Sequence, residues 1–184
     1  MNREEAFNLL KENVFNQNLI KHCLAVEAIM GVLARYFGKD QEKWALAGLL
    51  HDIDYDKVKD DLSQHSLVGA QMLEKLGLDK DIFQAVKVHN EAHGIAPETI
   101  MEKALFVTDP LTGLIVAAVL VLPSKKINDL TTENVLNRFK EKAFARGANR
   151  EIIKKCQELL NLKLEEFIKI GLGAMQKISS ELGL

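Results

Sequence analysis

Four polar residues of this chain stand where the surrounding sequence predicts an apolar core. His22 lies on the apolar stripe of an expected helix, and Asp109 lies within the apolar run ALFVTDPL. His51 and Asp52 end an almost entirely apolar segment, WALAGLLHD. A buried imidazole or carboxylate is costly unless hydrogen bonds or an opposite charge compensate it. The pattern therefore indicates a shared partner for the four side chains.

A divalent metal ion is the most economical shared partner, because one ion satisfies imidazole and carboxylate groups together. Each residue also has a simpler interpretation. A single buried histidine is more often hydrogen-bonded within the core, and a lone aspartate at a helix end is usually a cap. We favour the metal because each simpler interpretation requires a separate partner of its own.

The ordered set His22, His51–Asp52 and Asp109 resembles the H…HD…D signature of the HD-domain superfamily of metal-dependent phosphohydrolases. The resemblance is strongest over about residues 18–122. The stretches HDIDYD, from His51, and DPLTGLIVAA, from Asp109, look like a subfamily of predicted HD hydrolases. The dipeptide HD alone is a weak signal, whereas the ordered set is fairly specific. The resemblance implies a helical bundle in which these four residues bind a divalent metal.

Two further histidines resemble the ligands of HD proteins that hold two metals. His65 opens HSLVGA, which resembles their H-x-x-x-G-A segment, and His89 ends an expected helix. Asn90 stands where such proteins usually carry another histidine, so the number of ions, one or two, stays open. His93 could replace that ligand or be a solvent-exposed loop residue. The resemblance implies a first metal on His22, His51, Asp52 and Asp109 and a second on His65, His89 and a bridging Asp52.

Such a site would activate water for hydrolysis. A bound metal lowers the pKa of water toward neutrality, and two ions about 3.5–4 Å apart favour in-line attack on phosphorus. Mixed imidazole and carboxylate ligands suit Mn, Fe, Co, Ni or Zn, and the sequence does not choose among them. Asp52 and His51 are the predicted catalytic residues.

A phosphate substrate also requires cationic donors, and these are concentrated between residues 125 and 150. Lys125 and Lys126 follow Pro123, while Lys142, Arg146 and Arg150 flank Gly147 in the segment KEKAFARGANR. Arg146 is the best candidate because small neighbours leave its guanidinium free to grip phosphate. A solvated charged face is the alternative, and it is equally good for the three lysines.

Acidic residues near the expected ligands have supporting roles in this interpretation. Asp54 and Asp56 are candidates to orient the metal ligands, and Glu91 is a candidate general acid or base. The acidic stretch from Asp54 to Asp61 lacks the glycine and terminal glutamate of a calcium loop at the required spacings, so capping and solvation are its expected roles.

The elements that must position these residues are predicted to be helices throughout. The apolar periodicity favours helices over about 3–13, 18–37, 40–50, 63–76, 79–89, 98–122, 135–144 and 152–182. Pro110 is expected to kink or restart its helix. The run Leu114–Leu122 is rich in β-branched residues, but no second strand is available to pair with it, so we expect a buried helix. Ser63 and Asp79 are the expected caps of their helices.

Length and composition are consistent with one all-α domain over residues 1–184. We expect a metal-binding core over about 18–122 and a C-terminal helical extension over about 123–184. The 24 basic and 26 acidic residues, with a net charge of −2, argue against a nucleic-acid polymer as partner. A hydrophobic share of 47% with only three prolines favours a globular helical protein.

The remaining features favour a cytoplasmic protein with no membrane association. The first ten residues lack a basic and then an apolar segment, so we expect no secretory signal. The longest apolar run, Leu114–Leu122, is far shorter than the roughly 20 residues of a spanning helix. Cys23 and Cys156 belong to no C-x-x-C pair and are expected to be buried, reduced thiols.

The leading hypothesis is a metal-dependent phosphohydrolase acting on a small phosphate ester or nucleotide. A metal- or nucleotide-binding HD sensor without activity is the alternative, and a structural bundle with incidental histidines is a third. A cyclic-dinucleotide phosphodiesterase is disfavoured because NEAHGIAPE, after His89, lacks the glycine-tyrosine-proline element of that group. The C-terminal helix could pack on the bundle or join two chains in a homodimer.

Overall fold

The computed structural model describes all 184 residues and contains helices but no strands, so the predicted all-α fold is confirmed. Three short 3₁₀ helices accompany the α-helices: η1 (Leu62–Gln64), η2 (Glu91–His93) and η3 (Ile127–Asp129). The α-helices are α1 (Arg3–Asn13), α2 (Gln17–Tyr36), α3 (Gln41–Leu50), α4 (Tyr55–Val58), α5 (Leu67–Lys75), α6 (Lys80–Val88), α7 (Ile100–Leu120), α8 (Thr132–Lys140), α9 (Arg150–Lys154), α10 (Cys156–Leu160), α11 (Leu164–Lys177) and α12 (Ser179–Leu182).

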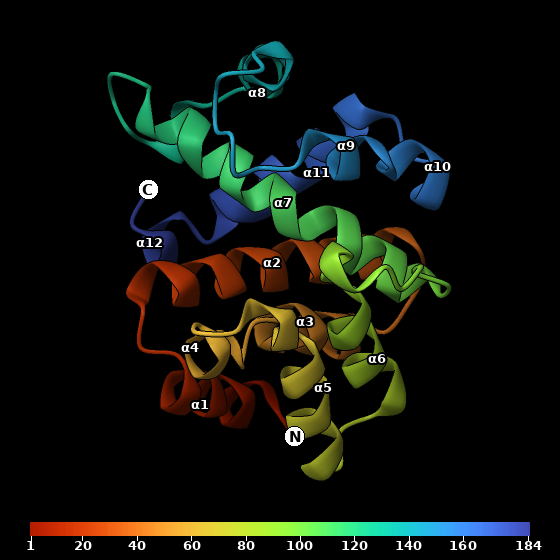
Figure 1. Cartoon of the computed structure of the whole chain (residues 1–184). Helices are drawn as coiled ribbons and strands as arrows, with labels where there is room; N and C mark the ends of the chain where they lie inside the picture. Colours follow the sequence, from red (N-terminus) through yellow and green to blue (C-terminus); the bar gives the residue numbers. More distant parts are fainter.

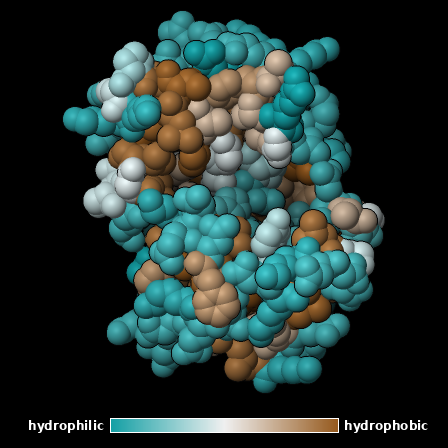
Figure 2. All heavy atoms as spheres, turned by 60° about the vertical axis from the view of Figure 1, so that its left-hand side comes forward, coloured by the Kyte–Doolittle hydropathy of each residue, from teal (hydrophilic) through white to brown (hydrophobic).

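Helix α2 crosses the middle of the molecule and separates two groups of helices (Figure 1). Helices α1 and α3 to α6 lie on one side, and α7 with α8 to α11 lies on the other. One connected cluster of 48 buried residues extends from Ala6 to Leu182 and links both groups. Figure 2 shows more apolar surface on the upper half, which α7 and the later helices build, than on the lower half.

The close packing of α3 on α2 brings the first histidines together. The side chain of Asn16 caps α2 by accepting hydrogen bonds from the backbone N–H groups of Asn18 and Leu19. Gly48 lets α3 approach, because a Cβ at this position would lie 2.9 Å from backbone atoms of Val26 and Glu27. Only glycine fits this contact without displacing a helix.

Helix α7 forms the other wall of the site and continues through Pro110 without a restart. Thr99 and Glu102 form a capping box at its N-terminus. The run from Leu114 is helical, as predicted, and it is largely buried. By length and composition α7 alone could cross a membrane, with a mean hydropathy of 1.6, yet 61% of that stretch is buried inside the fold. A core helix of a globular protein has the same character.

Three of the expected helix boundaries are wrong, and one of them belongs to the helix expected over 135–144, which ends at Lys140. The single long helix expected over 152–182 is divided into α9, α10, α11 and α12. Asn161 ends α10 in the left-handed conformation, with φ at 54°, which asparagine tolerates better than most residues. The helix expected from Ser63 is preceded by η1, and α5 begins only after Ser66.

Candidate metal centre

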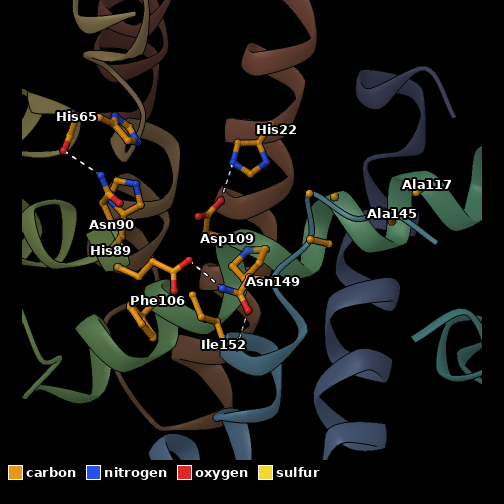
Figure 3. A pocket seen from close by; sticks show the side chains of 15 residues that line it. His22, His65, His89, Asn90, Phe106, Asp109, Ala117, Ala145, Asn149 and Ile152 are labelled. Atoms are coloured by element: carbon orange, nitrogen blue, oxygen red, sulfur yellow. Dashed lines mark hydrogen bonds and ion pairs between the residues drawn. The ribbon is translucent and has the colours of Figure 1, made fainter. Parts of the chain in front are cut away.

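Six side chains from separate elements converge at the face of α2 that meets α7. α2 provides His22, the end of α3 provides His51 and Asp52, and α7 provides Asp109. His65 precedes α5 and His89 follows α6. Figure 3 shows His22 facing Asp109, with His65 and His89 beyond them. We call these six residues the metal cluster: His22, His51, Asp52, His65, His89 and Asp109.

One part of the cluster lies between α2, α3 and α7. The Nε2 atom of His22 is 3.0 Å from Oδ1 of Asp109 and 3.1 Å from Nε2 of His51. Nε2 of His51 is 3.8 Å from the same Asp109 oxygen. A metal needs donor atoms this close together on several elements, and these three residues supply them.

The second part of the cluster shares Asp52 with the first. Oδ1 of Asp52 lies 3.3 Å from Nε2 of His65 and 3.4 Å from Nε2 of His89. Oδ2 lies 3.6 Å from His22, and Oδ1 lies 3.4 Å from His51. Asp52 therefore faces all four imidazoles, which is the placement that a carboxylate bridging two ions requires.

All four histidines of the cluster present the same ring nitrogen to the carboxylates. Each Nδ1 is engaged by an acceptor outside the cluster's centre, which leaves each Nε2 available to a metal ion or a proton. For His22 the acceptor is the hydroxyl of Thr112, whose own proton goes to the carbonyl of Asp109. The other acceptors are Gly48 O for His51 at 2.8 Å, Asp54 Oδ1 for His65 at 2.9 Å and Val86 O for His89 at 2.6 Å.

The electrostatics of the cluster favour a positive charge at its centre. Burial alone would raise the pKa of Asp52 and Asp109, but the facing imidazoles outweigh it and lower both pKa values below their ordinary range. Burial alone would lower the pKa of His65, yet hydrogen bonds and charges from Asp52 and Asp54 raise it to about 10. The pKa of His51 is also raised despite its burial, by Asp52 and Asp109.

These observations fit a divalent metal. Four lone pairs directed at two ionised carboxylates repel one another unless protons or cations lie among them. Imidazole and carboxylate donors together match the preferences of first-row transition metals. The donor set therefore fits one ion on His22, His51 and Asp109 and another on His65 and His89, with Asp52 between them.

Asn90 and His93 are both engaged outside the metal cluster. Nε2 of His93 is hydrogen-bonded to the backbone carbonyl of His65 at 2.6 Å, so the suggested role of His93 as a replacement ligand is wrong. The Asn90 amide donates to the same carbonyl at 3.3 Å, while its oxygen accepts from the N–H of Ala92. Both residues hold the loop that carries His65.

Cys23 lies next to the metal cluster. The sequence predicted only that Cys23 is a buried thiol. Its sulfur lies within 4.8 Å of donor atoms of His51 and Asp52, and the residue is fully buried. Burial, followed by the charges of Asp52 and Asp109, raises the pKa of the Cys23 thiol. The uncharged thiol packs beneath the cluster in this arrangement.

Asp54 orients His65. The carboxylate is fully buried and accepts hydrogen bonds from Nδ1 of His65 at 2.9 Å and from the backbone N–H of Gly69 at 2.7 Å. This position agrees with the supporting role expected from the sequence. Asp56, the other candidate, instead accepts from the backbone N–H of Phe15.

Replacing Asp54 with asparagine is expected to weaken metal binding at the His65–His89 part of the cluster by about 10- to 100-fold. A neutral amide cannot accept both hydrogen bonds, so His65 loses its fixed tautomer and orientation. Metal titration followed by elemental analysis measures the loss. Asp56→Asn is the matched control, and equal affinity of wild type and Asp54→Asn for two ions would contradict the assignment.

The metal cluster opens into a cleft of about 490 Å³ that α7 and the C-terminal part of the chain help to form. Glu91 lines it, and its Oε1 accepts a hydrogen bond from Nδ2 of Asn149 at 2.8 Å, drawn as a dashed line in Figure 3. The complete lining is His22, His65, His89, Asn90, Glu91, Phe106, Asp109, Pro110, Gly113, Ala117, Ala145, Gly147, Ala148, Asn149 and Ile152.

The cationic residues expected to hold phosphate are not among the lining residues. Arg146 is exposed between lining residues Ala145 and Gly147, and Lys125 and Lys126 are exposed after α7. Lys142 is also exposed. A role of Arg146, Lys125 or Lys126 in substrate binding therefore stays a prediction.

Arg150 was grouped with these cations, but it is structural. Its five N–H groups donate to six backbone carbonyls at the end of α8 and in the segment that follows, so one N–H is shared between two acceptors. The acceptors are Arg138, Phe139, Glu141, Phe144, Ala145 and Ala148. Arginine is the residue type whose planar group can donate to so many acceptors at once. Arg150 thereby holds the wall of the cleft and has no donor left for phosphate.

Arg150→Ala is expected to lower the free energy of unfolding by about 2–3 kcal/mol, since hydrogen bonds from a charged donor contribute more than neutral ones. Urea denaturation measures the change, and hydrogen exchange should report lost protection over residues 138–149. Arg146→Ala, in the same segment, is the control and should change stability by less than about 0.5 kcal/mol. Equal stability of both variants would refute the structural role.

Comparison with known proteins assigns the family. The family model of the HD domain matches residues 19–119, and the chain belongs to this family. The HD superfamily consists of metal-dependent phosphohydrolases, and its members bind divalent metals, in agreement with the histidine and aspartate groups described above. The resemblance identified in the sequence is therefore confirmed.

Named relatives include ribonuclease Y of several bacteria. The chain is 32% identical over 143 residues to ribonuclease Y of Oleidesulfovibrio alaskensis and 34% identical over 143 residues to that of Nitratidesulfovibrio vulgaris. Both alignments cover 75% of this chain but only 27% of the relative. An uncharacterized protein of Methanocaldococcus jannaschii is 31% identical over 180 residues, which cover 92% of this chain and all of that protein. No solved structure matches the chain.

Proposed function

We propose that the protein is a phosphohydrolase that cleaves a small phosphate ester or nucleotide with metal-activated water. The observation that carries this proposal is the orientation of the metal cluster: four Nε2 atoms face the shared carboxylate of Asp52 at the end of a cleft. A structural bundle has no need for six such side chains. The proposed ligands are the six residues of the metal cluster. They would hold one or two divalent ions of Mn, Fe, Co, Ni or Zn.

When bound, the metal supplies Lewis acidity and lowers the pKa of water. In the hydrolysis, a water oxygen bonds to phosphorus while the bond from phosphorus to the ester oxygen breaks. The proton released by water ends on the leaving alcohol, and the other product is phosphate. Asp52 and His51 are the proposed catalytic residues, because their buried side chains hold the reacting end of the cleft in a fixed geometry.

The decisive experiment measures metal content and hydrolysis together. The full chain, loaded in turn with Mn, Fe, Co, Ni or Zn, is assayed with phosphomonoesters, phosphodiesters, nucleotides and a short RNA. We expect at least one stoichiometric ion and turnover of a small ester. Stoichiometric metal without cleavage of any substrate would contradict the proposed activity.

Two alternatives are tested by the same panel. The relatives named ribonuclease Y make RNA a candidate substrate, and cleavage of the oligonucleotide in preference to small esters would favour that reading. The cleft's size and the balanced overall charge support a small substrate instead. Nucleotide binding without turnover would favour the sensor alternative.

A further inference from the structure

The cleft beside the metal cluster is free of permanent cations. None of its 15 lining residues is lysine or arginine. Arg150 is turned toward backbone carbonyls, and Lys155 lies 5.6 Å from the ring centre of Phe106 without lining the cleft. Each phosphoryl group of a nucleoside triphosphate needs its charge compensated by cationic donors or metal ions. Among the lining residues, only those of the metal cluster can supply that compensation.

The charge of the metal cluster matches one phosphoryl group. With two divalent ions bound, the carboxylates of Asp52 and Asp109 would leave a doubly positive centre, which a phosphomonoester dianion would neutralise. Any further phosphoryl group would extend along the cleft, where the remaining carboxylate is that of Glu91. Like charges that line or enter the same cleft repel one another.

Glu91 is held at a defined position on the wall of the cleft. The Oδ1 atom of Asn149 caps α9 by accepting from the N–H groups of Glu151 and Ile152. This cap directs the amide nitrogen of Asn149 toward Glu91, which it meets at 2.8 Å. The hydrogen bond joins η2 to the residue before α9, and it places the exposed carboxylate of Glu91 beside Asn149 on the lining of the cleft.

The part of the cleft away from the ligands suits an uncharged group. Pro110, Gly113 and Ala117 follow one face of α7, and a Cβ on Gly113 would meet nothing within 4 Å. Phe106 and Ile152 add apolar surface. These residues leave room for the flat, uncharged part of a substrate next to the phosphoryl group.

We propose that Glu91 is a specificity-determining residue that limits the protein to substrates with a single phosphoryl group, such as nucleoside 5′-monophosphates, and excludes di- and triphosphates. This inference rests on the proposed function and deepens it. In the reaction, water adds to the one phosphorus, the bond from phosphorus to the ester oxygen breaks, and the leaving oxygen takes the proton, giving a nucleoside and phosphate.

The test compares AMP with ATP on the metal-loaded full chain, by calorimetric binding in excess metal and by steady-state hydrolysis. Wild type is expected to prefer AMP over ATP at least about tenfold, in affinity and in kcat/KM. Glu91→Gln retains an oxygen that can accept from Asn149 but removes the charge. It should raise ATP affinity about five- to tenfold, mainly through the dissociation constant and KM.

Glu158→Gln is the matched control, because Glu158 is exposed on α10 outside the cleft. It should leave the preference for AMP unchanged. Equal or tighter binding of ATP by wild type, an unchanged preference in Glu91→Gln, or no measurable binding of either nucleotide would overturn the inference. Selective binding of AMP without any hydrolysis would instead support the inference and count against the proposed activity.

Discussion

Asp52→Asn is expected to reduce bound metal from one or two ions per chain to nearly none and to lower hydrolysis at least about 10³-fold. Asparagine has nearly the same shape, but it removes the negative charge that faces four imidazoles at 3.3–3.6 Å. Because Asp52 contacts both parts of the metal cluster, one substitution weakens both positions. Elemental analysis of the purified variant and the substrate panel measure the two effects.

Asp60→Asn is the control for the loss of one acidic side chain. Asp60 is exposed in the segment after α4, and its replacement should leave metal content and hydrolysis unchanged. If Asp52→Asn kept stoichiometric metal and near wild-type turnover, Asp52 would not be a ligand and the assignment of the whole centre would be wrong. Circular dichroism should show that the Asp52→Asn variant keeps its helices, so that a loss of metal or activity is not caused by unfolding.

Gly48→Ala is expected to lower the free energy of unfolding by about 2–3 kcal/mol, the effect of overpacking a tight contact. The added methyl group would lie 2.9 Å from Val26 O and Glu27 N, which belong to the backbone of α2 and cannot rotate away. Helix α3 must therefore move. The carbonyl of Gly48 also accepts from Nδ1 of His51, so the same movement should weaken metal binding. Thermal unfolding should shift downward by about 5–10 °C.

Gly173→Ala is the matched control for a glycine inside a helix. A Cβ at Gly173 in α11 would meet nothing within 4 Å. Alanine is the better helix former, so this variant should be more stable than wild type by up to about 1 kcal/mol. A Gly48→Ala protein as stable as Gly173→Ala would show that α2 and α3 do not depend on the close contact.

Local sequence patterns predicted the helices and identified most residues of the metal cluster. The Asp79 cap and the 3.6-residue apolar repeat depend on residues only a few positions apart, so they can be recognised without the tertiary structure. His22 and Asp109 were recognised as candidate ligands because they are polar residues in apolar surroundings, and a buried polar side chain needs a partner. The HD-family resemblance joined these residues to His65 and His89, which local patterns alone would not have singled out.

The errors of prediction concern partners that are distant in sequence or contacts that depend on backbone geometry. Arg150 carries the charge expected of a phosphate donor, but its six acceptors are backbone carbonyls, which every residue possesses and no sequence pattern marks. The division of the C-terminal helix depends on the conformation of Asn161, which packing selects. The Glu91–Asn149 contact spans 58 positions of sequence.

The amino-acid sequence alone therefore determined the helical class, the HD family and which side chains could form a metal centre. These properties follow from residue type and short-range spacing. Only the tertiary structure decided the tautomers of the four histidines, the roles of Asp54 and Arg150, and the position of Glu91 in a cleft whose lining contains no lysine or arginine. Those features depend on the directions in which atoms of distant segments meet, and these directions exist only after the helices have packed.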